Sequence, residues 1–209
     1  MKFSDQRFSD LLASFQSSEP TPGGGSASAL SGAVGASLLA MVAGLPKPRA
    51  HSREDAERLA DARAHCRSLS EGLAALMDRD SEAYDLVLVA FRLPKAREED
   101  NAARSLRIQE ALRSATEAPL EVMRACAKAI AEAAVVAGLG NVNAASDVQV
   151  GLELLGAGLR GAKLNVDVNL ASLNDEAFAA AVRDEADRLV AESRRGQAAA
   201  AALLPPAHY

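Results

Sequence analysis

The chain has 209 residues and a formal net charge of −5, and its acidic and basic residues are interleaved. This pattern argues against a nucleic-acid-binding face and against binding to a membrane surface through a basic patch. The two cysteines and three histidines share no ligand spacing, so we expect neither a disulfide framework nor a metal site. Hydrophobic residues make up 49% of the chain but aromatic ones only 3%, which leaves alanine and leucine, both helix formers, to build a core.

Apolar residues recur at helical spacing along most of the chain, which predicts about six helices in one domain covering residues 1–209. The predicted helices cover about residues 3–17, 27–45, 52–93, 98–137, 145–166 and 172–196. Two spacings, Ser52 with Asp55 and Ser172 with Asp175, are capping-box variants that predict where the third and sixth helices begin. We expect the chain to fray after about residue 196.

The second predicted helix, at residues 27–45, is apolar enough to raise the possibility of a membrane span. Serine and glycine interrupt it and prolines bound it, so we favour a helix surrounded by neighbouring helices. The N-terminus lacks the hydrophobic segment of a signal peptide. We therefore predict an all-α, largely antiparallel bundle with one long helix, located in the cytoplasm.

Asp80 interrupts the apolar stripe of the long third helix. The stripe alternates spacings of three and four, which is typical of a seam against a partner helix, and it predicts an apolar residue where Asp80 stands, shortly after Leu76. Asp78 and Asp85 lie off this stripe, and we expect them to be solvated. Burial would raise the pKa of the Asp80 carboxyl and make it a candidate general acid. The alternatives are a buried salt bridge and a stripe rotated to expose Asp80.

A glycine-rich turn separates the first two predicted helices. Thr21 can cap the second helix, and Pro22 suits its first position. The next residues would leave the N–H groups of the first turn uncovered, which favours a bound carboxylate or phosphate; they are Gly23, Gly24, Gly25 and Ser26. Close helix packing and a simple flexible turn are the alternatives. The turn is not a P-loop, because no Gly-Lys-Ser/Thr follows it.

Two further features carry polar groups at helix ends. Four short polar side chains gather where the fifth helix begins: Asn141, Asn143, Ser146 and Asp147. They can cap that helix or bind a polar ligand. Lys95 follows the end of the long helix, where its ammonium group could hold an anion or simply be exposed in a loop.

Together these stretches resemble the formiminotransferase-cyclodeaminase family, specifically its cyclodeaminase and cyclohydrolase domain. The matching motifs lie at residues 20–26, 80–84, 93–95, 140–147 and 165–170. The similarity extends from about residue 8 to about residue 192.

The resemblance implies an all-helical fold that dimerises through helix faces, with folate sites at or near the subunit contacts. It implies a formimidoyltetrahydrofolate cyclodeaminase or a methenyltetrahydrofolate cyclohydrolase, with a tetrahydrofolate derivative as substrate and no tightly bound cofactor. Asp80 matches the family's proposed proton donor, the aspartate of an Asp-x-x-Ala-aromatic motif. The implied substrate-binding residues are Gly23, Gly24, Gly25, Ser26, Lys95, Asn141, Asn143, Ser146 and Asp147. A higher homo-oligomer and a separate formiminotransferase are further candidate partners.

Residues 43–51 depart from the family pattern. Many members carry an asparagine-leucine-threonine stretch and a lysine-lysine-tyrosine motif there, and this chain has neither. Lys47 and Arg49 are candidate replacement cations. The departure motivates the alternative hypothesis, a non-catalytic helical protein that binds folate or acts as a scaffold.

Overall fold

The computed structural model describes residues 2–205, and every regular element in this part of the chain is a helix. The all-α prediction is confirmed. In chain order the elements are η1 (Phe3–Asp5), α1 (Phe8–Phe15), α2 (Gly24–Ala43), α3 (Arg53–Phe91), α4 (Glu98–Leu139), η2 (Val142–Ala144), α5 (Ala145–Ala171) and α6 (Glu176–Ala201).

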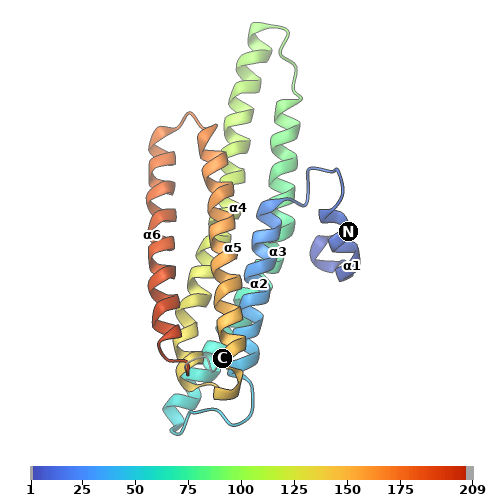
Figure 1. Ribbon diagram of the computed structural model, residues 1–209. Helices are drawn as coiled ribbons and strands as arrows, with labels where there is room; N and C mark the ends of the chain where they lie inside the picture. Colours follow the sequence, from blue (N-terminus) through green and yellow to red (C-terminus); the bar gives the residue numbers. More distant parts are fainter. Residues whose placement is uncertain (1, 206–209) are drawn as a thin grey trace.

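Helices α2 to α6 run lengthwise through the molecule, and the chain direction reverses from each helix to the next (Figure 1). Helix α2 packs against α3, α4 and α5, while α6 packs mainly against α4. The hairpin formed by α3 and α4 extends beyond the start of α2 (Figure 1). This arrangement leaves the start of α2 enclosed by longer helices, which is where the candidate site lies.

Helix α2 carries no charged residue and is long and apolar enough to cross a membrane by composition alone. In the bundle, 61% of its apolar window is buried against neighbouring helices, as expected for a core helix. Glycines allow its backbone to approach α5 closely. A Cβ atom added at Gly35 would lie 2.7 Å from the carbonyl oxygen of Gly151, and one added at Gly158 would lie 2.7 Å from that of Ser28.

The helix boundaries confirm one capping prediction and correct two others. Ser52 caps α3 by accepting a hydrogen bond from the Asp55 N–H, as predicted. Helix α6 is instead capped by Asp175, whose side chain accepts from the N–H of Phe178, while Ser172 ends α5. Helix α2 begins at Gly24 with Gly23 as its N-cap, so Thr21 and Pro22 lie before the helix.

The helix α6 also continues past residue 196, where we expected fraying, and ends at Ala201 with Ala200 fully buried.

Asp78 is buried, with only 7% of its surface exposed, so the expectation that it is solvated is wrong. Its carboxylate accepts hydrogen bonds from the Phe3 N–H and from the Ser4 hydroxyl, each at 2.6 Å. The N-terminal segment thus folds over this side of α3 and covers a carboxylate that helix periodicity alone would leave in water. Asp85 is exposed, as expected.

Candidate active site

A pocket of about 240 Å³ lies at the start of α2. The loop before α2 and the first turn of that helix form one side, and the end of α5 forms another. Helix α3 contributes Asp80 and Tyr84, and helix α4 contributes Ala115. Four helices therefore converge on one small polar cavity.

The glycine turn and Asp80, which the sequence offers as separate features, form one structure. The Ser26 hydroxyl donates to Oδ2 of Asp80 over 3.0 Å, and the backbone N–H of Ser26 also donates to this carboxyl. A Cβ atom added at Gly25 would overlap the carboxyl group of Asp80. The Asp80 carboxyl is therefore the anion held at the N-terminus of α2, a place that favours negative charge.

Opposing effects set the pKa of the Asp80 carboxyl. Burial between helices raises it above the ordinary value of 3.8, and this is the largest effect. The hydrogen bonds from the Ser26 hydroxyl and N–H lower it, because they stabilise the charged form, but the net direction is upward. Asp80 therefore holds a proton to a higher pH than an exposed aspartate does, as the stripe argument predicts.

Ser26 can serve both protonation states of Asp80. Its hydroxyl lies 3.1 Å from the carbonyl oxygen of Met77 and 3.2 Å from the Ser81 hydroxyl. A serine hydroxyl has one hydrogen but two lone pairs. It can donate to the Asp80 carboxylate, or donate to Met77 and accept from the protonated acid. The site is thus built to let Asp80 exchange a proton without leaving a buried group unpaired.

The glycine turn does not act as one unit. Gly23, Gly24 and Gly25 line the pocket, and Gly25 is also buried against the Asp80 carboxyl, whereas Ser26 is buried behind the pocket wall. Ser26 has no exposed surface and does not line the cavity, so its contact is with Asp80 and not with a ligand in the pocket.

Three polar residues of the pocket were missed as site residues by the sequence analysis. Asn165 and Asn169 come from the end of α5; their side-chain NH₂ groups donate to the carbonyl oxygens of Gly161 and Ala115, at 2.9 and 3.0 Å. Tyr84 is the third. The spacing of four between Asn165 and Asn169, and between Asp80 and Tyr84, places each pair on one helix face and was the signal available.

The polar group at residues 141–147 lies at the opposite end of α5 from this pocket. The rise of the helix puts it roughly 30 Å from Asn165. Asn141 acts as a cap: its side-chain oxygen accepts from the Asn143 N–H at 2.9 Å, and its NH₂ group donates to the carbonyl oxygen of Pro46. Asn143 and Ser146 are exposed, and Asp147 is half-buried.

Lys95 is exposed in the turn between α3 and α4, roughly 20 Å along the hairpin from Asp80. Within one chain, the structure therefore brings neither Lys95 nor the 141–147 group into the Asp80 pocket.

The two candidate replacement cations of residues 43–51 differ from each other. Arg49 donates to the carbonyl oxygen of Ala137, whereas Lys47 is exposed with a backbone φ of 57°, in the left-handed region.

Comparison with known proteins identifies the family to which this fold belongs. The sequence pattern of the family described as formiminotransferase-cyclodeaminase matches residues 7–188, and the chain belongs to this family. A methenyltetrahydrofolate cyclohydrolase from Methylorubrum extorquens is 43% identical over 188 residues, which cover 90% of this chain and 89% of that protein.

A formimidoyltransferase-cyclodeaminase from Sus scrofa is 35% identical over 178 residues, covering 83% of this chain but 32% of that protein. The chain thus spans about a third of the length of this longer relative. Among solved structures, the formiminotetrahydrofolate cyclodeaminase from Thermotoga maritima matches with a TM-score of 0.86 and 24% identity, covering 97% of this chain and 98% of that one. This match establishes the shared fold.

Proposed function

We propose that this chain hydrolyses methenyltetrahydrofolate and that Asp80 transfers the proton in that reaction. The chain is an enzyme of folate one-carbon chemistry. The observation that carries the choice of reaction is the 43% identity to a methenyltetrahydrofolate cyclohydrolase over nearly the full length of both chains. The half-buried carboxyl at the pocket wall supplies the acid–base group that this chemistry needs.

In the hydrolysis, water attacks the methenyl carbon that bridges N5 and N10 of the pterin. The attack gives a tetrahedral carbon that bears a hydroxyl group, and one of its two C–N bonds then breaks. The Asp80 carboxylate can take one proton from the attacking water and, once protonated, return it to the departing nitrogen. The hydroxyl group loses the second proton of that water to solvent as it becomes the formyl carbonyl, so the overall reaction releases one proton and Asp80 ends as a carboxylate.

Cyclodeamination of formiminotetrahydrofolate is the second candidate, favoured by the 35% identity to the longer cyclodeaminase. In this reaction N10 attacks the formimino carbon and ammonia leaves after protonation, which a protonated Asp80 can supply. The residues of this chain match about a third of the length of that relative, and a separate formiminotransferase is the candidate partner that would provide the substrate.

A direct assay of the purified chain with both folates separates these candidates. Hydrolysis of methenyltetrahydrofolate is measured as loss of its near-ultraviolet absorbance above the buffer rate, and cyclodeamination as ammonia release from formiminotetrahydrofolate. We expect the first signal to dominate. Dominant ammonia release would favour the second reaction. Folate binding with neither signal would support the non-catalytic alternative and overturn the proposal.

We further propose that the active form is a homodimer joined through the outer face of α2 and α5. Although α2 carries no charge, it exposes residues at a spacing of seven, Ala27, Val34 and Met41. The adjacent face of α5 exposes Val150 and Leu164. An uncharged helix face in water is typical of a surface that a partner covers.

A second copy of the chain is the partner that the charges on this face favour. Two exposed charged residues lie on α5 between Val150 and Leu164: Glu153 and Arg160. Neither forms a salt bridge with another residue of the described chain. In a two-fold arrangement with antiparallel α5 helices, Glu153 of each copy would meet Arg160 of the other, which is the self-complementarity that such an interface requires.

This dimer would unite the two halves of the predicted site. The Asp80 pocket opens beside exposed Val168 near the end of α5, and Ser146 lies near the start of α5 on the same face as Val150. A two-fold axis near the middle of the α2/α5 face would place the start of α5 of one copy beside the end of α5 of the other. The partner's polar group at 141–147 would then border the Asp80 pocket and orient the pterin.

The dimer is tested by its mass in solution. We expect the 21.7 kDa chain to elute at twice that mass and Val34→Asp to shift it to the monomer with loss of activity. Phe8→Asp, which places the same charge at an exposed apolar position outside this face, serves as the control. A fully active monomer would overturn the shared site.

A further inference from the structure

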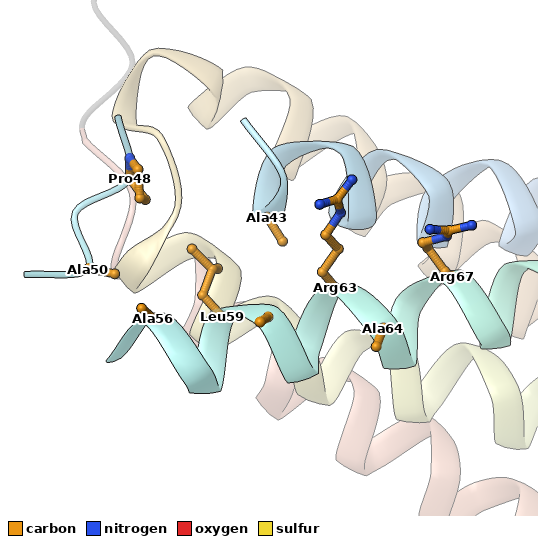
Figure 2. Close-up of a pocket in the computed structure, with 9 residues that line it drawn as sticks. Ala43, Pro48, Ala50, Ala56, Leu59, Arg63, Ala64 and Arg67 are labelled. Atoms are coloured by element: carbon orange, nitrogen blue, oxygen red, sulfur yellow. The ribbon is translucent and has the colours of Figure 1, made fainter. Parts of the chain in front are cut away.

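Two arginines lie one helical turn apart at the end of the molecule opposite Asp80. Arg63 and Arg67 project from α3 toward the end of α2, on the same side of α3 (Figure 2). Both are exposed, and no salt bridge or side-chain hydrogen bond joins either guanidinium group to another residue in the range 2–205. A Cβ atom added at Gly44 would lie 2.7 Å from Cζ of Arg63, so this guanidinium packs closely on the last turn of α2.

The arginines line two adjacent hollows, each of about 410 Å³. The first is otherwise lined by alanine, leucine and proline side chains, and the two arginines are its charged groups (Figure 2). The second also includes Met41 and one acidic residue, Glu71, which forms no salt bridge with either arginine. Two guanidinium groups beside an apolar surface, without a bonded carboxylate, form a place where a ligand carboxylate gains strong hydrogen bonds.

The spacing of the pair favours a dicarboxylate. Side chains at positions i and i+4 of a helix have Cβ atoms about 6 Å apart, and both guanidinium groups extend in the same direction. A terminal glutamyl group carries two carboxylates separated by three carbon atoms. One such group can therefore reach both arginines at once, with each guanidinium donating to one carboxylate.

The glutamate tail of a folate needs such a site, because the glycine turn is not free to bind it. The Asp80 carboxyl already occupies the N-terminus of α2 and accepts the hydrogen bonds that a tail carboxylate would otherwise receive. A second anion beside Asp80 would also be repelled when Asp80 is charged.

The arginines cannot serve the pocket of their own chain by direct reach. They lie roughly 20–25 Å from Asp80 along α3. Their hollow and the Asp80 pocket nevertheless border the same outer face at opposite ends, since one includes exposed Met41 and the other exposed Val168. A two-fold axis through that face therefore sets the arginine hollow of one copy beside the Asp80 pocket of the other.

We infer that Arg63 and Arg67 bind the two carboxylates of the glutamate tail of the folate whose pterin lies in the partner's Asp80 pocket. The inference rests on the proposed folate activity and dimer. It assigns the recognition of the glutamate tail to one chain and the proton transfer to the other.

The test compares folates with and without the tail. For Arg63→Ala/Arg67→Ala we expect the KM for methenyltetrahydrofolate to rise about tenfold or more, with kcat nearly unchanged, because two charge-assisted hydrogen-bond partners are lost. Methenyltetrahydropteroate, which lacks the glutamate, should show the same KM with wild-type and variant protein. The matched control is Arg194→Ala/Arg195→Ala, which removes two exposed positive charges from α6.

Calorimetric binding of tetrahydrofolate and tetrahydropteroate accompanies the kinetics, so that a chain without turnover still reports on the arginines. Wild-type protein that binds the two ligands equally well would overturn the inference, whatever the turnover. An equal loss of affinity for both ligands in the double variant would also overturn it. Absence of turnover with intact discrimination between the ligands would count against the proposed reaction and in favour of the arginine site.

Mixed dimers test which chain each group serves. Asp80→Asn chains are co-expressed with Arg63→Ala/Arg67→Ala chains, and heterodimers are isolated through two different tags. If the arginines serve the partner's pocket, one site of each heterodimer keeps both Asp80 and an intact arginine pair, so activity with the wild-type KM returns to about half. Activity that shows only the raised KM would overturn the assignment to the partner.

Discussion

The two ends of α2 differ in how their polar groups are satisfied. At its start, Asp80, Ser26 and Ser81 hydrogen-bond among themselves and to the backbone, inside a pocket walled by four helices. Near its end, Arg63 and Arg67 line an open hollow, and Asn143 and Ser146 are exposed at the start of α5. The first end holds its acid in a closed hydrogen-bond network, and the second presents side chains that have no hydrogen-bond or salt-bridge partner among residues 2–205.

Under the proposed function, the difference shows how a helical bundle could bind a long substrate with a small pocket. Roughly 30 Å of α2 separates the Asp80 end from the arginine end. The proposed two-fold dimer would place the Asp80 end of one copy beside the arginine end of the other. The contrast between the ends therefore makes distinct predictions for substitutions at each.

The largest effect is expected for Asp80→Asn. The amide keeps the shape of the side chain but cannot transfer a proton, so we expect kcat for methenyltetrahydrofolate to fall by about 100-fold or more. Stopped-flow or steady-state absorbance measures this loss. Turnover within a few-fold of wild type would remove Asp80 from the mechanism.

The same variant should not lose its fold. Because the pKa of the Asp80 carboxyl is raised in the folded state, its stabilising contribution is fully present below the unfolded-state pKa and is lost as pH rises through the folded-state pKa. At a pH above the folded-state pKa the charged carboxyl therefore opposes folding, and there its replacement by a neutral amide should leave the melting temperature equal or higher. Circular dichroism on heating checks this expectation.

Next in size is the effect of a methyl group at Gly25. An alanine Cβ there overlaps the Asp80 carboxyl and must push it away from Ser26, so we expect kcat to fall about tenfold or more with a smaller change in KM. Gly24→Ala is the matched control, since its Cβ would meet Asn165 at an ordinary 3.6 Å. Equal losses in both variants would indicate general damage to the start of α2.

These neighbouring glycines illustrate what the sequence can and cannot predict. The apolar stripe identifies Asp80 as anomalous, and the glycines identify the start of α2 as an anion site. Neither pattern shows how α2 and α3 are aligned along each other. That alignment places the Asp80 carboxyl itself in the anion site at the start of α2. Asp78 was misjudged for a similar reason, because its cover comes from residues 74 and 75 positions away in sequence.

Local signals near helix ends are also ambiguous when two candidate caps lie close together. Ser172 and Asp175 are both good N-cap residues, and the sequence spacing favours the first. In the structure Asp175 is the N-cap of α6, and its side chain also accepts a hydrogen bond from Arg113 of α4 at 2.8 Å. Tertiary contacts of this kind decide between caps of similar intrinsic strength.

At the start of α5, the polar residues 141–147 should show two different roles, substrate binding and helix capping. Asn143→Ala and Ser146→Ala remove exposed side chains, so we expect a several-fold rise in KM, the size of one lost neutral hydrogen bond each, and unchanged stability. Asn141→Ala removes a cap and its bond to Pro46, and should lower the free energy of unfolding by about 1 kcal/mol. Denaturant titration and KM measurements separate the two outcomes; unchanged KM values would place this group outside the folate site.

The smallest effect is expected for Ser26→Ala, which leaves Asp80 in place and removes one hydrogen bond that lowers its pKa. The folded-state pKa of Asp80 should therefore rise further. Because the proposed hydrolysis starts from the Asp80 carboxylate, activity is lost as pH falls through that pKa, and the variant should lose its activity at a higher pH than wild type does. The pH profile of kcat measures this shift.

Since the Ser26 hydroxyl is buried away from the pocket, KM should stay nearly constant, whereas a large rise in KM would mean that Ser26 contacts substrate. Ser26→Thr, which retains the hydroxyl, should restore the wild-type profile wherever the added methyl group fits, and this distinguishes a positioning role from a packing role.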